Sequence, residues 1–454
     1  MTPDSFTLAA TGDAIIAHPV SQVQGNDAQF DALIEVLQGA DAAVTQLEPV
    51  FVDGTCRHAS LAQVRDQYQY LAPFPGALIG TDPALVDELT AMGLNLFTLA
   101  SNHALDFGHD GLETTLAALR NHELTFAGVG DDRADARAPA YLETDAGRVG
   151  LVDASTSVPP GGAAGVSTDR FDGVPGINPL HVEWTYRVPP DRLEQLRAIA
   201  EQTGIEAVKG EWLRREHPDW AADDAFYFMQ MRFAPATEQR PPGIYQSLRQ
   251  QDREAVLAGV SDAAANADWV VMGLHSHQSR AGSRNTSEVP SFLQGFARDC
   301  ADAGADAVVV TGPHTLRGIE VYQDSVVCYS LGNLFFQDDA FYRIPDAVSE
   351  TTDETVPDVR GDAASEETTS DVDHDADNWQ SVVPECTFDA AGGLDRVTLY
   401  PCTLQPTADR PRRGMPVLAT GERAESILRT VARRSAPFGT TVSIEDGVGT
   451  VELS

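Results

Sequence analysis

The sequence predicts an α/β fold with a largely parallel central sheet, and one pattern along the chain supports this. Strand-like apolar segments alternate with helix-like segments through the first 155 residues, and again from about residue 250 onward. A helix between two strands returns the chain to the starting edge of the sheet, so successive strands run in the same direction. A second pattern is the presence of polar residues where the predicted strands end, and it indicates the position of a candidate functional site.

The predicted strands are short runs of apolar and β-branched residues that are bounded by turn-forming residues. They cover residues 5–10, 42–47, 94–100, 148–152, 269–274, 307–310 and 326–329. The first of these runs, residues 5–10, is interpreted as a buried strand.

The predicted helices show apolar residues at helical spacing, as with Phe30, Leu33 and Leu37. Pro83 near the start of one helix and Gly93 just beyond its end have the polarity expected of helix termini. The predicted helices cover residues 27–38, 83–92, 112–119, 190–204, 250–266, 291–303 and 422–434. Each of the first three follows or precedes a predicted strand, as crossover connections require.

The chain divides into a core and two segments of different composition. Residues 1–340 are predicted to form the core, with residues 182–242 as an inserted helical cap. Residues 344–377 are rich in Asp, Glu, Thr and Ser without periodicity, which predicts an acidic, disordered and mobile linker. Residues 378–454 are expected to complete the core.

The formal net charge of −37 and the pI of about 4.4 limit the partners of this protein. Nucleic-acid binding depends on neutralising phosphates with Lys and Arg, so the excess of carboxylates argues against it. The same excess argues against anionic membrane surfaces. Because the acidic residues are spread along the whole chain, we interpret them as the solvated surface of a halophilic protein.

The sequence also indicates a cytoplasmic location. The N-terminus lacks a basic region followed by an apolar run, and no stretch approaches the roughly 18 apolar residues of a membrane span. The cysteines are odd in number, widely spaced and without a CxxC pair, which favours reduced thiols over a disulfide framework. They are Cys56, Cys300, Cys328, Cys386 and Cys402.

Polar residues recur at the carboxyl ends of the predicted strands, where open α/β sheets bind their ligands. They are Asp13, Glu48, Asn102, His103, His275, His277 and His314. Any one of them has an ordinary structural explanation, such as turn formation, helix capping or a hydrogen-bonded imidazole. Their recurrence at equivalent positions favours a common site.

Carboxylate, amide and imidazole ligands without a thiolate suit one or two divalent transition metals such as Mn, Fe or Zn. A carboxylate that bridges two ions is typical of two-metal hydrolytic sites. The sequence therefore predicts a metal centre at this edge of the sheet.

Several stretches resemble the CapA family, the poly-γ-glutamate capsule synthesis proteins with a calcineurin-like metallophosphatase fold. The stretches are TGDAII, TQLEPVF, GLNLFTLASNHALDFGHDGLETTLAAL, VPGINPL, GLHSHQ and GADAVVVTGPHTLRGIEVYQDSVVCYSLGNLFF, in the order of the family. The resemblance implies a four-layer α/β/β/α metallophosphoesterase-like sandwich.

The resemblance also implies roles for individual residues. Asp13, Glu48, Asn102, His275 and His314 would be metal ligands, with Glu48 as the bridging carboxylate. His103 would be the general acid. His277 is an additional candidate ligand or phosphate contact, and Asn333 is expected to hold a nearby loop. Asp106 could orient His103 or cap the following helix, and we favour the cap.

Two positions depart from the family pattern. Metallophosphatases generally carry a His two residues after the first Asp, where this chain has Ile15. A further His usually precedes the final ligand, where this chain has Thr311 and Gly312. The ligand shell is therefore expected to be one or two residues short, which bears on catalysis more than on fold.

These observations leave three hypotheses. The first is a hydrolase of phosphoesters or related bonds that uses metal-bound water, with His103 assisting the leaving group. The second is a non-catalytic or weakly catalytic accessory in poly-γ-glutamate biosynthesis. The third is a degenerate metal-site protein that binds an anion. In each case the partner is an anionic small molecule or polymer.

Overall fold

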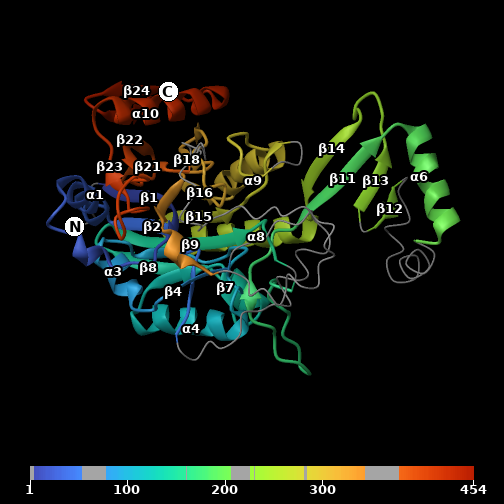
Figure 1. The fold of residues 1–454 in the computed structure, drawn as a ribbon, viewed down its shortest axis with the longest axis horizontal. Coiled ribbons are helices and arrows are strands. Elements are labelled where there is room, and N and C mark those ends of the chain that lie inside the picture. Colours follow the sequence, from blue (N-terminus) through green and yellow to red (C-terminus); the bar gives the residue numbers. More distant parts are fainter. Residues whose placement is uncertain are drawn as a thin grey trace.

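The computed structural model describes residues 5–53, 78–159, 161–205, 225–229, 231–280, 284–342 and 378–453. It contains mixed sheets and helices, which confirms the predicted α/β class (Figure 1). The predicted acidic linker at residues 344–377 and Cys56 lie outside the described residues. None of the described helices is long and apolar enough to cross a membrane.

A ten-stranded sheet has the strand order β24-β25-β22-β21-β1-β2-β5-β6, with β19 beside β1 and β23 beside β22. Its strands are β1 (Ser5–Ile15), β2 (Ala42–Gln46), β5 (Leu96–Thr98), β6 (Thr125–Ala127), β19 (Asn333–Phe336), β21 (Gln380–Asp389), β22 (Leu394–Thr403), β23 (Val417–Leu418), β24 (Val442–Glu445) and β25 (Val448–Val451). Strand β1 runs parallel to β2 and β19 and antiparallel to β21.

A six-stranded sheet has the order β17-β18-β16-β15-β9-β8. Its strands are β8 (Ala140–Thr144), β9 (Gly147–Ser155), β15 (Trp269–His275), β16 (Ala307–Thr311), β17 (Ile319–Tyr322) and β18 (Ser325–Cys328). The four central strands are parallel, whereas β8 and β17 pair antiparallel with their neighbours. The expected parallel pairing is present in the core of each sheet, from β19 through β1, β2 and β5 to β6 in one and from β18 through β16 and β15 to β9 in the other. Both sheets gain antiparallel strands because tight turns, and not helices, join β8 to β9, β17 to β18 and β21 to β22.

The helices and remaining strands complete the described elements. The helices are α1 (Ala28–Gly39), α3 (Leu85–Ala91), α4 (Gly108–Asn121), α5 (Arg133–Arg137), α6 (Pro190–Thr203), α8 (Gln250–Asn266), α9 (Ser291–Asp302) and α10 (Gly421–Ser435). The short strands are β3 (Val50–Phe51), β4 (Leu78–Thr81), β7 (Val129–Gly130), β10 (Gly176–Ile177) and β20 (Phe341–Tyr342).

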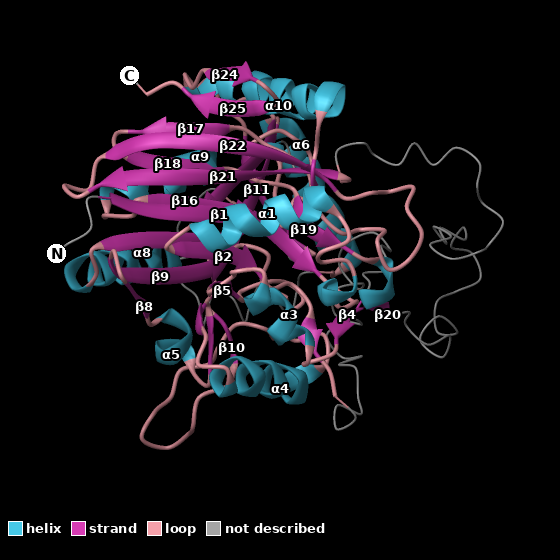
Figure 2. Cartoon of the chain, turned by 90° about the vertical axis from the view of Figure 1, so that its left-hand side faces the viewer, coloured by secondary structure: helices cyan, strands magenta, loops and turns pink. Residues whose placement is uncertain are grey.

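The alternation of side chains along the strands produces the layers. In β15, Trp269 and Val271 lie in the core between the two sheets, whereas Val270 and Met272 lie in a second core beneath α8 and α9. The ring of Trp269 stacks on Phe6 of β1 at a centroid distance of 5.0 Å. A third core packs α1, α3 and α4 on the other face of the ten-stranded sheet. The arrangement is therefore helices, sheet, sheet and helices (Figure 2).

The described part of residues 182–242, which the sequence predicted to be an inserted helical cap, contains the predicted helix, α6, and strands as well. It also supplies β11 (Val182–Val188), β12 (Phe226–Phe228) and β13 (Met231–Pro235), which join β14 (Gly243–Leu248) in a four-stranded sheet. Figure 1 shows this unit standing beyond one end of the two large sheets. Gln246 in β14 donates a hydrogen bond to the Ser279 carbonyl, 3.3 Å away, so the unit contacts the loop that follows β15.

Candidate metal centre

Asp13 lies inside β1 and is fully buried. The sequence had placed it just after the strand, but β1 continues to Ile15. Asp13 stands opposite Gln46 of β2 and Asn333 of β19, and the register shifts at Asp13 on both sides. Gly12 permits this path, because a Cβ atom there would lie 1.8 Å from the Gly332 carbonyl oxygen. The resulting irregularity places the Asp13 carboxylate among the strand ends.

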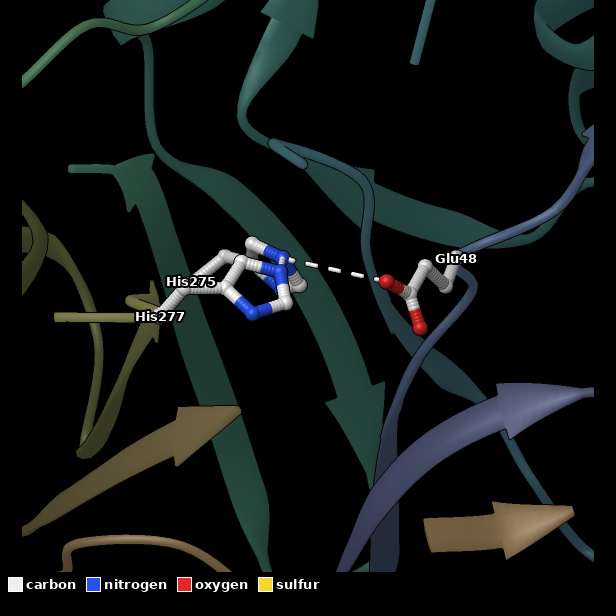
Figure 3. A group of neighbouring side chains, drawn as sticks. All are labelled: Glu48, His275 and His277. Carbon is white, nitrogen blue, oxygen red and sulfur yellow. Dashed lines mark hydrogen bonds and ion pairs between the residues drawn. The ribbon is translucent and has the colours of Figure 1, made fainter. Parts of the chain in front are cut away.

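Glu48 follows β2 and lies at the centre of the site, with 1% of its surface exposed. Its Oε1 atom lies 3.8 Å from Nε2 of His103 and 3.9 Å from Nε2 of both His275 and His314. Among the described residues, neither Glu48 oxygen has a hydrogen-bond partner, and the same holds for Oδ1 of Asp13. Figure 3 shows the Glu48 carboxylate facing the rings of His275 and His277.

Burial makes the carboxyl groups of Glu48 and Asp13 weaker acids than usual. Desolvation raises the pKa of Glu48 well above its usual value, and repulsion from Asp13 and Asp106 adds to the effect. Desolvation likewise raises the pKa of Asp13 to about 7, although the Gly312 N–H, which donates to Asp13 Oδ2 over 2.9 Å, acts in the opposite direction. Such groups gain much from a cation, because an unpaired buried charge is costly.

Three candidate ligand atoms converge beside Glu48. The Asn102 amide oxygen lies 2.9 Å from Nε2 of His275 and 2.8 Å from Nε2 of His277. Nδ1 of His275 is 3.1 Å from the Thr311 hydroxyl, and Nδ1 of His277 is 2.7 Å from the Asn285 amide oxygen. These outer contacts orient both rings so that their Nε2 atoms point inward.

Both imidazoles are electrostatically suited to bind a metal. Burial lowers the pKa of His275 and His277 well below the usual range, and neighbouring positive charge lowers it further. The rings are therefore neutral near pH 7 and keep a lone pair for coordination.

His314 completes the other side of the site. Its Nδ1 atom lies 2.8 Å from the Asn333 amide oxygen and 3.6 Å from Asp13 Oδ2. Burial lowers the pKa of His314 to about 4. Asn333 contacts the His314 ring directly, so it holds a candidate ligand, whereas the sequence had suggested that it holds a loop.

His103 and Asp106 form a dyad, and the favoured prediction that Asp106 caps the following helix was wrong. Helix α4 begins at Gly108, its N-cap is Phe107, and no side chain caps it. Asp106 instead lies 2.7 Å from Nδ1 of His103 and accepts a hydrogen bond from the Ile79 N–H of β4. The alternative that Asp106 orients His103 agrees with this geometry.

The candidate ligands form two groups that share Glu48. One group is Glu48, His275 and His277, and the other is Asp13, Glu48 and His314. Within each group the ligand atoms all lie within 4.8 Å of one another. The unpartnered buried oxygens of Glu48 and Asp13 at the overlap fit a divalent cation, and both groups have oxygen and nitrogen donors suited to transition metals.

The structure explains the two departures from the family pattern. Ile15 is buried in a small apolar cluster with Ile79 and Ala340, so it contributes no ligand. Gly312 has φ of +100°, which favours glycine, and a Cβ atom there would lie 3.0 Å from the His275 ring. Its backbone N–H serves Asp13 instead.

Sequence reasoning missed two residues that support the site. Asp153 follows a predicted strand directly, so the signal used elsewhere could have found it. Its Oδ2 atom accepts hydrogen bonds from the N–H groups of Leu99 and Ala100, at 2.9 and 2.8 Å, and so holds the segment that leads to Asn102. Asn285 lies in a loop eight residues after His277, and no pattern in the sequence marks it.

Comparisons with known proteins identify the family of this chain. The sequence model of the family described as bacterial capsule synthesis protein PGA_cap matches residues 7–338, which include every candidate ligand. The protein y4sH of Sinorhizobium fredii is 32% identical over 465 residues, covering 99% of this chain and 94% of its own length.

Two named relatives are more distant. The PGA biosynthesis protein CapA of Bacillus subtilis is 24% identical over 304 residues, covering 66% of this chain and 58% of its own length. The capsule biosynthesis protein CapA of Bacillus anthracis is 21% identical over 340 residues, covering 73% and 60% respectively. The chain thus spans about three fifths of each Bacillus protein. A family match over more than half of the chain confirms the resemblance, and the protein belongs to the PGA_cap family of bacterial capsule synthesis proteins.

Proposed function

We propose that this chain is a metal-dependent hydrolase of phosphoesters or related bonds. The observation that carries the proposal is the Glu48 carboxylate, which is buried, lacks a hydrogen-bond partner among the described residues and is shared by two groups of candidate ligands. A divalent ion bound there would act as a Lewis acid and would lower the pKa of water to supply a nucleophile at neutral pH.

The chain's own residues have separate tasks in this proposal. Asp13 and His314 hold one side of the centre, and His275, His277 and Asn102 hold the other. Nε2 of His103 lies 3.8 Å from Glu48 Oε1 and donates a proton to the oxygen of the leaving group. Asp106 fixes the opposite nitrogen of that ring, in the manner of the carboxylate in a catalytic triad.

A second candidate is an accessory role in capsule or poly-γ-glutamate biosynthesis with little or no catalysis. The names of the two Bacillus relatives favour it, and so does Ile15 at a usual ligand position. A cytoplasmic location is proposed for either role, because the described cysteines, Cys300, Cys328, Cys386 and Cys402, are buried and unpaired. The halophilic source stays a prediction.

The test combines metal content with turnover. Wild type, Asp13→Ala, His103→Ala and the control His109→Ala are assayed on phosphomonoesters and phosphodiesters with added Mn²⁺. His109 lies on α4 near the dyad, but its side chain is exposed. We expect His103→Ala to lose about 10²- to 10⁴-fold in turnover while retaining metal, and Asp13→Ala to lose metal as well.

The outcomes separate the two candidates. Metal bound by wild type together with no turnover on any substrate would favour the accessory. Wild type without metal, and Asp13→Ala indistinguishable from it, would refute the hydrolase. Unchanged activity of His109→Ala shows that the losses are specific to the site.

A further inference from the structure

Arg284 lies in the loop between β15 and α9 and has no obvious structural role. Its side chain is exposed, and within the described part of the chain no hydrogen bond or ion pair engages its guanidinium. The sequence has 68 Asp and Glu residues against 31 Lys and Arg, so a cation without a carboxylate partner is unexpected. An arginine left unpaired on such a surface is available for a ligand.

Arg284 lies beside the candidate metal centre. Its backbone pairs with that of Gln278, the residue after the candidate ligand His277, and the Asn285 N–H donates to the His277 carbonyl at 3.2 Å. The adjacent residue, Asn285, contacts Nδ1 of His277 through its side chain at 2.7 Å. Arg284 is therefore positioned beside the centre by the same loop that orients one of its candidate ligands.

Arg317, which is fully buried, anchors the loop that carries Arg284. The Arg317 guanidinium donates to the Thr286 carbonyl at 2.9 Å, to the Gln278 carbonyl at 2.9 Å and to the Ser279 hydroxyl at 2.8 Å. The Thr286 N–H also donates to the Ser279 hydroxyl at 3.0 Å. Both ends of the loop are thus tied together, which limits the entropy that Arg284 would lose on binding a ligand.

We propose that Arg284 is the residue that recognises an oxyanion group of the substrate beside the metal centre. The inference rests on the proposed function for the identity of the neighbouring centre. A guanidinium presents parallel N–H donors that match phosphate or carboxylate oxygens. In a chain of net charge −37, an anionic substrate also needs a local positive charge to approach the buried carboxylates of the site.

The test measures anion affinity and metal content on the same samples. Wild type, Arg284→Gln, Arg284→Lys and the control Arg192→Gln are titrated calorimetrically with inorganic phosphate and with glutarate, with and without Mn²⁺. Arg192 is exposed on α6 and pairs only with its sequence neighbours Asp191 and Gln195 among the described residues. Equal melting temperatures establish that the variants fold.

We expect Arg284→Gln to weaken the binding of at least one anion about tenfold or more, because it loses charge-assisted hydrogen bonds. Arg284→Lys should restore part of the affinity, since it returns the charge without the planar fork. The anion affected identifies the source as phosphate or carboxylate. If wild type holds no metal and Arg284→Gln still loses anion affinity, the inference stands while the proposed function fails. Unchanged affinity for both anions, at wild-type metal content, would overturn the role of Arg284 and leave the metal centre standing.

Discussion

Glu48→Gln should change stability in opposite directions with and without metal. Glutamine has nearly the same shape as glutamate but carries no charge. In metal-free wild type the carboxylate is buried without a partner among the described residues, and desolvation raises its pKa well above the usual range. Near pH 8 the substitution removes that cost, so metal-free Glu48→Gln should be at least as stable as wild type.

With metal the order should reverse, because Glu48 belongs to both groups of candidate ligands. A ligand at 100 times its dissociation constant stabilises a protein by about 2.7 kcal/mol. For 454 residues at about 2.1 cal/mol/K each, the unfolding entropy is about 0.95 kcal/mol/K, so this corresponds to about 3 °C in melting temperature. Loss of the shared ligand should reduce the shift to below about 1 °C.

Differential scanning calorimetry at pH 8, with EDTA or with Mn²⁺, measures both effects. Glu113→Gln is the matched control, because Glu113 is exposed on α4. It should show the full shift of wild type. An equal metal-induced shift in wild type and Glu48→Gln would refute the assignment of Glu48 as the shared ligand.

The remaining predictions concern protons and the supporting carboxylates. Since the pKa of Asp13 is raised to about 7 and that of Glu48 well above its usual value, metal binding should release protons, and affinity should rise from pH 6 to pH 8. Calorimetry in two buffers of different ionisation enthalpy counts the protons, and a count of zero would contradict both shifts. Asp106→Asn should lower turnover about 10- to 100-fold at unchanged metal content, because the amide can still accept from the Ile79 N–H but no longer provides a carboxylate for His103. Equal turnover would show that Asp106 is only structural. Burial raises the pKa of Asp153 to about 8, so the folded state keeps a proton that the unfolded chain loses near pH 4. Its stabilising contribution is complete below pH 4 and is lost as pH rises to about 8. Asp153 should therefore account for roughly 2 kcal/mol of the unfolding free energy that chelated wild type loses between pH 6 and pH 8, and Asp153→Asn should lose that much less in denaturant titrations.

The fold was predictable where local patterns determine it. The apolar run from Trp269 to Met272 was recognisable as a strand from the sequence. In the structure its side chains alternate between two buried cores. The antiparallel half of the ten-stranded sheet was not predictable. Strand β21 pairs with β1, which precedes it by more than 360 residues, and nothing in residues 380–389 specifies that partner. Pairing over such distances depends on the whole packed structure and not on local propensity.

The error at Asp106 has the same origin. A short acidic residue just before a helix satisfies the local rule for a cap. Here the carboxylate is engaged by the Ile79 N–H, from a strand 27 residues earlier, and by the His103 ring. A local rule fails when contacts from distant segments bind the same group more strongly. Asp106 is 8% exposed, so an unsatisfied carboxylate there would be costly.

The departures at Ile15 and Gly312 have a different meaning in the structure than in the sequence. A count of residues along the chain indicated a deficient ligand shell. In space, His277 joins Glu48 and His275, so each of the two groups has three His, Asp or Glu ligands. Structural zinc sites are closed by four protein ligands, whereas catalytic sites use three and leave a position open for water or substrate. The group of Asp13, Glu48 and His314 would therefore leave a position open for water or substrate, whereas Asn102 adds a fourth candidate ligand to the group of Glu48, His275 and His277.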